Sequence, residues 1–168
     1  MQNRLANFSR LDMNMLWDEE PDLLDLDNGE YHLVVRRMDL GYLTGYVGVT
    51  NSHPLYGQDY GKTMVKELDV HGGITFTGEF DIEPFKEKYW YIGFDAAHLM
   101  DKVPYVEMTE IEIELPSKIM QILLEAKENE EYRDFTYMVK QTDKIYRQLL
   151  EMKKRTTNTD INDNIKGE

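Results

Sequence analysis

Cysteine is absent from this chain of 168 residues, and the absence removes several kinds of site at once. Without thiols the protein has no disulfide framework, no thiolate nucleophile and no zinc site that depends on thiolate ligands. A reducing compartment, the cytoplasm, is therefore the expected location. The length is typical of one domain.

Long apolar runs are also missing from the sequence. No window approaches the roughly 20 apolar residues that a membrane-spanning helix needs. The first 16 residues carry Arg4 and Arg10 among polar residues and contain no uninterrupted apolar stretch, so they do not look like a secretory signal. These features predict a protein without a membrane partner.

Positive charge is scarce, because 19 Lys and Arg residues stand against 32 Asp and Glu residues, for a net charge of −13. A surface this acidic repels phosphate backbones, which proteins bind through Lys and Arg, so no nucleic acid partner is expected. The basic run from Lys153 to Arg155 ends a predicted helix, where cations favour the helix dipole. The acidity leaves two interpretations open, plain solubility or attraction to a basic protein surface.

Several catalytic signatures are missing as well. None of the serines lies in a GxSxG elbow. Gly41, Gly45 and Gly48 are spread along a predicted strand and form neither a phosphate-binding loop nor a dinucleotide fingerprint. The residue pattern therefore does not support a serine hydrolase or a phosphate-loop enzyme.

The residue pattern predicts an α+β fold, with an antiparallel or mixed sheet of about five or six strands and a C-terminal helical segment packed on it. The predicted strands are rich in aromatic and β-branched residues or alternate between apolar and polar residues. They are Tyr31–Arg37, Tyr42–Val49, Met64–Val70, Ile74–Phe80, Tyr89–Phe94 and Val106–Leu115. Few helical segments separate them, which favours this sheet over a βαβ alternation.

Helical periodicity is found at both ends of the chain. Residues 3–17 predict a weak amphipathic helix. Pro116 suits the first position of a C-terminal helical segment, since its missing N–H costs nothing there. The amphipathic stretch from Tyr132 to Leu149 needs a surface for its apolar stripe, either the sheet or the seam of a homodimer.

The same patterns divide the chain into regions. We expect a single α+β domain over residues 1–155, which includes the N-terminal helix and an acidic connector, Asp18–Glu30. That connector is interpreted as a solvated loop. The polar, aperiodic residues 156–168 are expected to form a disordered tail.

One candidate site follows the strand predicted at Met64–Val70. Asp69 and His71 fall on the same side of that strand, because side chains alternate with a period of two. Gly72 and Gly73 follow directly and remove side chains where another group could approach the backbone closely. The pattern is typical of a functional loop, and equally of a hairpin turn with a surface histidine.

A second candidate group lies near residue 98. Asp95 has the character of an N-cap for a short helix, on which Asp95, His98 and Asp101 are spaced three apart and share one face. Together with His71, these residues offer imidazole nitrogens and carboxylate oxygens, the ligand types of a divalent metal. No other cofactor is indicated.

Loop residues add a possible ligand surface. His53 precedes a proline, which holds the local backbone extended, and Tyr56 and Tyr60 follow in the same loop. Aromatic rings beside His and Asp suit a planar, polar ligand such as a nucleotide base. His32, on a predicted strand without neighbouring acids, is interpreted as structural. The predicted ligand-binding set is His53, Tyr56, Tyr60, Asp69, His71, Gly72, Gly73, Asp95 and His98.

Several blocks of the sequence carry a family resemblance. GYVGV at Gly45–Val49, HPLYGQDY at His53–Tyr60, LDVHGGITF at Leu68–Phe76 and WYIGFDAAHLMD at Trp90–Asp101 resemble a group of small proteins encoded by bacteriophages and prophages. EYRDFTYMV, at 131–139, looks like the C-terminal helix of the same group. The resemblance covers about half of the chain and implies a phage or prophage origin, hence the cytoplasm of a host cell, and little chemistry.

Three classes of function remain open at the level of sequence. The first is a protein that binds a small molecule, such as a nucleotide-like host defence signal, in a counter-defence role. The second is a metal-dependent hydrolase in which His71, His98 and Asp95 hold the ion and Asp69 or Asp101 acts as base. The third is an acidic inhibitor of a basic host protein, with Asp18–Glu30 as its contact.

Overall fold

The computed structural model describes residues 17–105 and 117–165. It contains five strands, β1 (Leu23–Asp27), β2 (Tyr31–Arg37), β3 (Leu43–Val49), β4 (Phe76–Gly78) and β5 (Trp90–Asp95). Its helices include α2 (Thr63–Lys66), α3 (Ser117–Glu128) and α4 (Phe135–Ile165). None of the helices in these ranges has the combined length and apolar character that a membrane crossing requires. The predicted α+β class is confirmed.

The strands form one antiparallel sheet in the order β1-β2-β3-β5-β4. Strands β2, β3 and β5 occupy its centre, and their residues are mostly buried. Near-continuous apolar and aromatic residues suit strands that are covered on both faces. Both faces of this sheet are indeed covered, one by α4 and the other by aromatic side chains.

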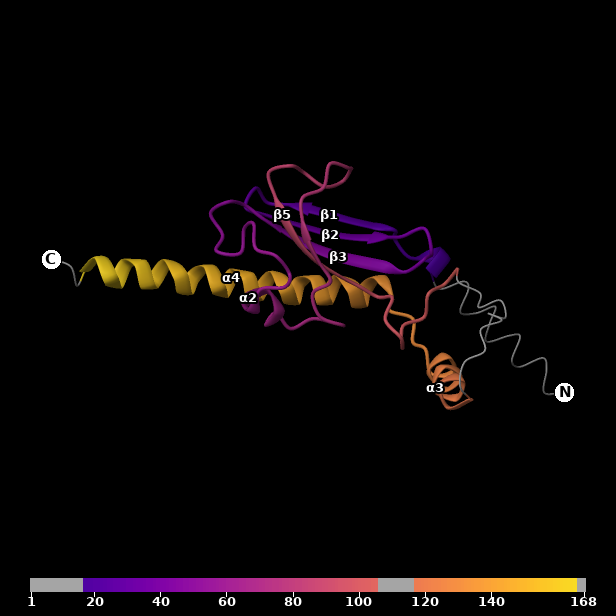
Figure 1. Cartoon of the computed structure of the whole chain (residues 1–168). Helices are drawn as coiled ribbons and strands as arrows, with labels where there is room; N and C mark the ends of the chain where they lie inside the picture. The colour runs from indigo at the N-terminus through magenta and orange to yellow at the C-terminus, as the bar shows by residue number, and fades with distance from the viewer. Residues whose placement is uncertain (1–16, 106–116, 166–168) are drawn as a thin grey trace.

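Helix α4 lies along one face of the sheet and continues past its edge towards the C-terminus (Figure 1). Its buried stripe consists of Met138, Thr142, Ile145 and Leu149, whose spacing keeps them on one side of the helix. Gly45 on β3 allows the close approach, because a Cβ there would lie 2.5 Å from Thr142 Oγ1. The predicted packing of this helix on the sheet is confirmed, and its stripe needs no second subunit.

Helix α4 begins with a clear cap. The Asp134 carboxylate accepts a hydrogen bond of 2.6 Å from the Tyr137 N–H, and Glu20 accepts one of 2.8 Å from the Phe135 N–H. These acceptors satisfy N–H groups that have no partner within the helix. The start of α4 is therefore held in place, which matters because the candidate site draws on its first turn.

The other sheet face carries an aromatic cluster. Tyr46, Phe85 and Tyr91 are buried there, and Phe80 stacks on Phe85 at a centroid distance of 4.0 Å. Such pairs add to the free energy of burial through their ring geometry. The loop between β4 and β5 thus covers this face in place of a helix.

Strand β1 corrects the interpretation of Asp18–Glu30 as a solvated loop. Its acidic side chains contact residues of other strands and loops: Asp25 accepts a 2.7 Å hydrogen bond from His32 Nε2, and Asp27 pairs with Lys86 at 2.6 Å. His32 is buried and also bonds to Tyr91 Oη at 2.7 Å, in keeping with the structural role predicted for it. Residues 23–27 are thus hydrogen-bonded into the sheet as a strand and do not form a loop.

Two further predictions of secondary structure differ from the fold. Residues Met64–Val70 are not a strand, since α2 forms a single helical turn that buries Val65. Strand β4 covers only three residues of the predicted Ile74–Phe80. The predicted hairpin across His71–Gly73 is therefore wrong, although the turn at that place is real.

The C-terminal part of the chain is more helical than expected. Helix α4 extends to Ile165 and so includes ten residues of the expected disordered tail. Within that part, the Thr156 and Thr157 hydroxyls donate to the carbonyls of Met152 and Lys153, four residues earlier, which keeps these polar residues compatible with a helix. The helix predicted at 3–17 and the strand predicted at Val106–Leu115 lie outside the described residues, apart from Trp17.

Candidate metal centre

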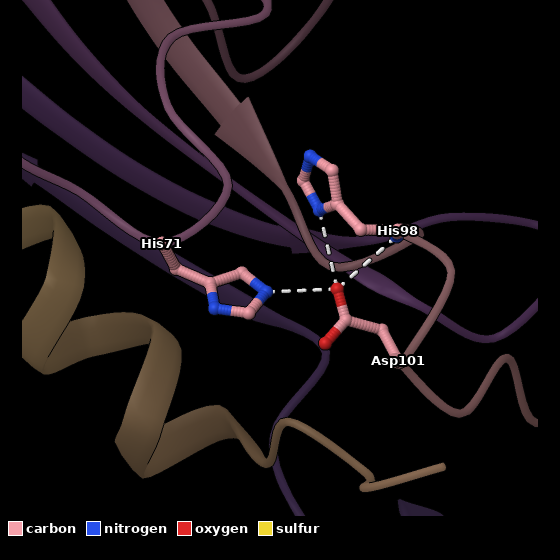
Figure 2. A group of neighbouring side chains, drawn as sticks. All are labelled: His71, His98 and Asp101. Atoms are coloured by element: carbon pink, nitrogen blue, oxygen red, sulfur yellow. Dashed lines mark hydrogen bonds and ion pairs between the residues drawn. The ribbon is translucent and has the colours of Figure 1, made fainter. Parts of the chain in front are cut away.

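Asp101 is the centre of the candidate site. It follows β5 in a turn, and its N–H donates to the carbonyl of His98 at 2.9 Å. The side chain is buried, and its Oδ2 meets His71 Nε2 at 2.8 Å and His98 Nδ1 at 3.2 Å (Figure 2). The same oxygen accepts from the His98 N–H at 3.1 Å. Two imidazoles from separate parts of the chain therefore converge on one carboxylate oxygen.

The short helix predicted from Asp95 to Asp101 is a turn in the structure. Asp95 ends β5, and its carboxylate accepts from the Ala97 N–H at 3.1 Å and from the Thr75 hydroxyl at 2.7 Å. Its Oδ1 lies 3.9 Å from His98 Nδ1. Asp95 thus stands at the edge of the cluster, and Asp101 takes the position that the sequence pattern suggested for both.

His71 is oriented by helix α4. Its N–H donates to Gln141 Oε1 at 3.1 Å, and its Nδ1 lies 3.0 Å from Tyr137 Oη. With both ring nitrogens engaged, the ring is held with Nε2 towards Asp101. The His71 and His98 rings stand nearly perpendicular, with centroids 5.4 Å apart.

Arg133 completes the surroundings of Asp101. Its Nε donates to Asp101 Oδ1 at 3.0 Å, and its guanidinium also pairs with Glu131. Burial alone would raise the pKa of Asp101, but the hydrogen bonds from His71 and Arg133 outweigh burial and hold the pKa below its ordinary value. Asp101 is therefore an anion at neutral pH.

Gly72 lies directly against the His98 ring. The glycine has a φ of +65°, and a Cβ at this position would lie 2.6 Å from His98 Nδ1 and closer still to other ring atoms. Only a residue without a side chain allows this contact. The close approach predicted for the glycine pair is found at Gly72, whereas Gly73 has no atom within 4 Å of such a Cβ.

The three side chains lie close enough together to hold a metal ion. One ligand atom from each of His71, His98 and Asp101 lies within 4.8 Å of the others. The side-chain exposure is 14% for His71, 34% for His98 and 1% for Asp101. The group is thus anchored on a buried carboxylate and open to solvent on the His98 side.

Asp69 does not belong to the group. No strand forms at residues 67–70, so the expected alignment of Asp69 with His71 has no basis. Its side chain is exposed and pairs with Lys144 Nζ at 2.7 Å. Its main chain exchanges hydrogen bonds with the Gln148 amide. The structure gives Asp69 a surface ion pair with α4 in place of the predicted role.

The loop residues are also separate from the group. Tyr56 packs against Trp90, with ring centroids 6.3 Å apart, and Tyr60 is about half exposed. His53 is buried and bonded to the main chain of Leu149. A hollow of about 430 Å³ exists elsewhere, lined by Glu79, Phe80, Asp81 and Glu87. These contacts do not bring the predicted aromatic ligand surface together with the histidine pair.

His53 has a fixed tautomer. The Leu55 N–H donates to its Nδ1 at 3.1 Å, so Nδ1 carries no proton and the Nε2–H donates to the Leu149 carbonyl at 3.0 Å. Burial lowers the pKa of this histidine, and the bond to Leu149 only partly offsets the effect. A proton on Nδ1 would break the bond to Leu55, so the folded protein favours the neutral ring.

We expect the folded protein to lose stability as pH falls below about 6.5, the ordinary histidine pKa, because the unfolded chain then binds a proton at His53 that the folded chain resists. The loss continues down to the lower, folded pKa and then levels off. Urea unfolding of the parent and of His53→Gln, which keeps a donor and an acceptor but does not titrate, measures the effect. Equal pH dependence of the two proteins would contradict it.

Two residues of the site, Arg133 and Tyr137, were not predicted from the sequence. They are four residues apart and meet across the start of α4, where the guanidinium lies 5.2 Å from the centre of the tyrosine ring. Arg133 precedes α4 and Tyr137 lies in its first turn, so helical periodicity does not pair them. Their spacing gives no sign of which distant turn they contact, because that depends on how α4 docks on the sheet.

Searches of protein-family models, of curated proteins and of solved structures found no match for this chain. The resemblance to phage and prophage proteins therefore stays a prediction.

Proposed function

We propose that this protein binds a divalent transition metal through His71, His98 and Asp101. The observation that supports the proposal most is the convergence of one atom from each residue within 4.8 Å. Neutral imidazole and carboxylate are ligands that zinc, iron and related metals accept together. Calcium and magnesium prefer oxygen ligands alone and fit this donor set less well.

The surroundings of the ligands also support a metal. A ligating histidine commonly donates its second ring N–H to a neighbouring group, and Tyr137 Oη stands 3.0 Å from His71 Nδ1 for this purpose. Ligating carboxylates are themselves hydrogen-bonded in known sites, and here Arg133 Nε donates to Asp101 Oδ1 at 3.0 Å. Arg133 and Tyr137 would thus orient two of the three ligands.

Hydrolysis is the reaction class that we assign to the site. Three protein ligands leave a coordination position for water, and a divalent metal lowers the pKa of that water towards neutrality. The exposure of His98 gives solvent and substrate access to this side of the cluster. Asp95, 3.9 Å from His98 Nδ1, is the nearby carboxylate that could accept the proton of the water.

The test is a titration of chelator-treated protein with Zn²⁺ and Co²⁺. Calorimetry measures the binding of both metals, and visible absorption also measures that of cobalt. We expect one equivalent to bind. His71→Ala or His98→Ala should weaken binding about 100-fold, or about 2.7 kcal/mol, since each removes one of three ligands. Asp69→Asn is the matched control, because Asp69 lies in an ion pair with Lys144 and should leave affinity unchanged.

Two outcomes separate the parts of the proposal. Absence of binding, or equal weakening by Asp69→Asn, would remove the metal site altogether. If the metal binds but the loaded protein cleaves p-nitrophenyl esters of acetate and phosphate no faster than free metal does, hydrolysis is excluded for those esters while the metal site stands. With activity present, Asp95→Asn should slow cleavage without releasing the metal.

A further inference from the structure

Strand β1 has one paired and one unpaired edge among the described residues. It pairs with β2, and the strand order places it at the end of the sheet. The Arg37 N–H donates to the Asp22 carbonyl, and the Asn28 N–H to the Tyr31 carbonyl. Because hydrogen-bonded positions alternate along an antiparallel pair, the backbone groups of Leu23, Asp25 and Asp27 point away from β2.

The side chains of β1 protect this edge only in part. Charged side chains, above all lysine, and proline protect many edge strands, and β1 contains Asp25 and Asp27 but neither lysine nor proline. Leu23 is 48% exposed and Leu26 is 55% exposed, one on each face of the sheet. The edge therefore offers three outward backbone positions flanked by apolar side chains.

A second copy of the chain is a poor occupant. The two-fold antiparallel pair that engages all three outward positions is centred on Asp25, and it would place Asp25 opposite Asp25 and Leu23 opposite Asp27. Like charges directly opposite each other destabilise a strand pair, and each copy carries a net charge of −13. Self-association at this edge is thus opposed both by the facing aspartates and by the repulsion between two acidic molecules.

A basic strand meets the opposite situation. Residues 18–30 contain seven acidic residues and no Lys, Arg or His. Asp18 and Glu19 are exposed, and Arg37 is shared by Glu20 and Asp22, which leaves the surroundings of β1 negative. Lys86 and Lys88 offset the charge of Asp27, so Asp25, with its side chain 40% exposed, is the main acidic neighbour for an added strand.

We propose that β1 receives an extended, basic segment of another protein as a sixth strand. Main-chain hydrogen bonds to Leu23, Asp25 and Asp27 supply the pairing. Basic side chains on one face of the segment lie opposite Asp25, and apolar side chains on the other face pack on Leu24 and Leu26. This surface is separate from the metal site, and the two proposals stand or fall independently.

The probe is the peptide acetyl-Val-Lys-Val-Lys-Val-Lys-Val-amide, with the Val/Glu peptide of the same pattern as control. Backbone amide exchange of the full chain is followed by NMR. We expect the lysine peptide, and not the glutamate peptide, to slow exchange at Leu23, Asp25 and Asp27. Leu23→Pro removes an outward N–H without touching the β1–β2 pairing and should weaken binding at least about tenfold, whereas Leu23→Val should not.

Several results would overturn this proposal. Binding that protects none of the three amides would be mere charge attraction. Slow exchange at these amides without peptide would mean that the edge is already occupied, by another part of this chain if it is independent of concentration and by a second copy if it rises with concentration. Equal binding by Leu23→Pro and Leu23→Val would exclude strand addition.

Discussion

Asp101→Ala is expected to lower the free energy of unfolding by about 3 kcal/mol, near the lower end of the range for breaking a buried ion pair. The variant leaves the Arg133 guanidinium with only the exposed Glu131 as an ionic partner, and it removes the acceptor shared by His71 and His98. Most of the loss comes from these part-buried groups that lose a hydrogen-bond partner, and less from the ion pair itself. Urea unfolding in the presence of a chelator measures it without any contribution from metal.

Two further variants test this explanation. Asp101→Asn keeps the volume and one acceptor oxygen, so its loss should be smaller. The double variant Asp101→Ala/Arg133→Met also removes the guanidinium that has lost its buried acceptor and should recover part of the stability, which a double-mutant cycle quantifies. If Asp101→Ala unfolds at the same urea concentration as the parent, Asp101 does not anchor the turn at the end of β5.

The central strands could be predicted from the sequence because they are covered on both faces. Tyr31–Arg37 matches β2 over its whole length, β3 begins one residue later than predicted, and β5 is displaced by one residue at both ends. Runs of β-branched and aromatic residues are informative there because burial and local preference agree. The stripe of α4 was predicted for the same reason.

The edge strand β1 and the turn α2 were missed because local pattern and tertiary contacts disagree. In β1 two of five residues are aspartates, which disfavour strands until His32 and Lys86 supply their partners. The apolar residues Val65, in α2, and Leu68, two residues after it, suit a helical turn, while the longer run to Val70 also suits a strand. Short apolar segments do not distinguish these two structures.

The candidate site was predicted in part, and for a reason that did not depend on the predicted helix. His98 and Asp101 are close because a spacing of three residues brings side chains together in a turn as in a helix. The approach of His71 to this pair depends on the tertiary structure, because Tyr137 and Gln141 of the docked α4 hold His71 in place. The sequence marks His71 as a candidate ligand, but only the fold identifies Asp101 as its partner.

Gly72→Ala is expected to weaken metal binding about 100-fold, or about 2.7 kcal/mol, as much as His98→Ala, although it removes no ligand. The new Cβ would overlap the His98 ring, lying 2.6 Å from its Nδ1. The ring is one-third exposed and can swing outwards, which carries Nδ1 away from His71 and Asp101. The φ of +65° adds about 1 to 2 kcal/mol of lost stability.

Gly73→Ala is the matched control for this variant. Gly73 has a φ of +83° and open space where a Cβ would lie, so alanine there carries the same kind of backbone strain without reaching His98. We expect both variants to lose similar stability, but only Gly72→Ala to lose affinity for Zn²⁺ in calorimetry. Equal affinities of the two variants would mean that the position of the His98 ring does not matter for the metal, and His98 would then cease to be a ligand. The glycine pair therefore separates strain in the turn from the placement of the imidazole.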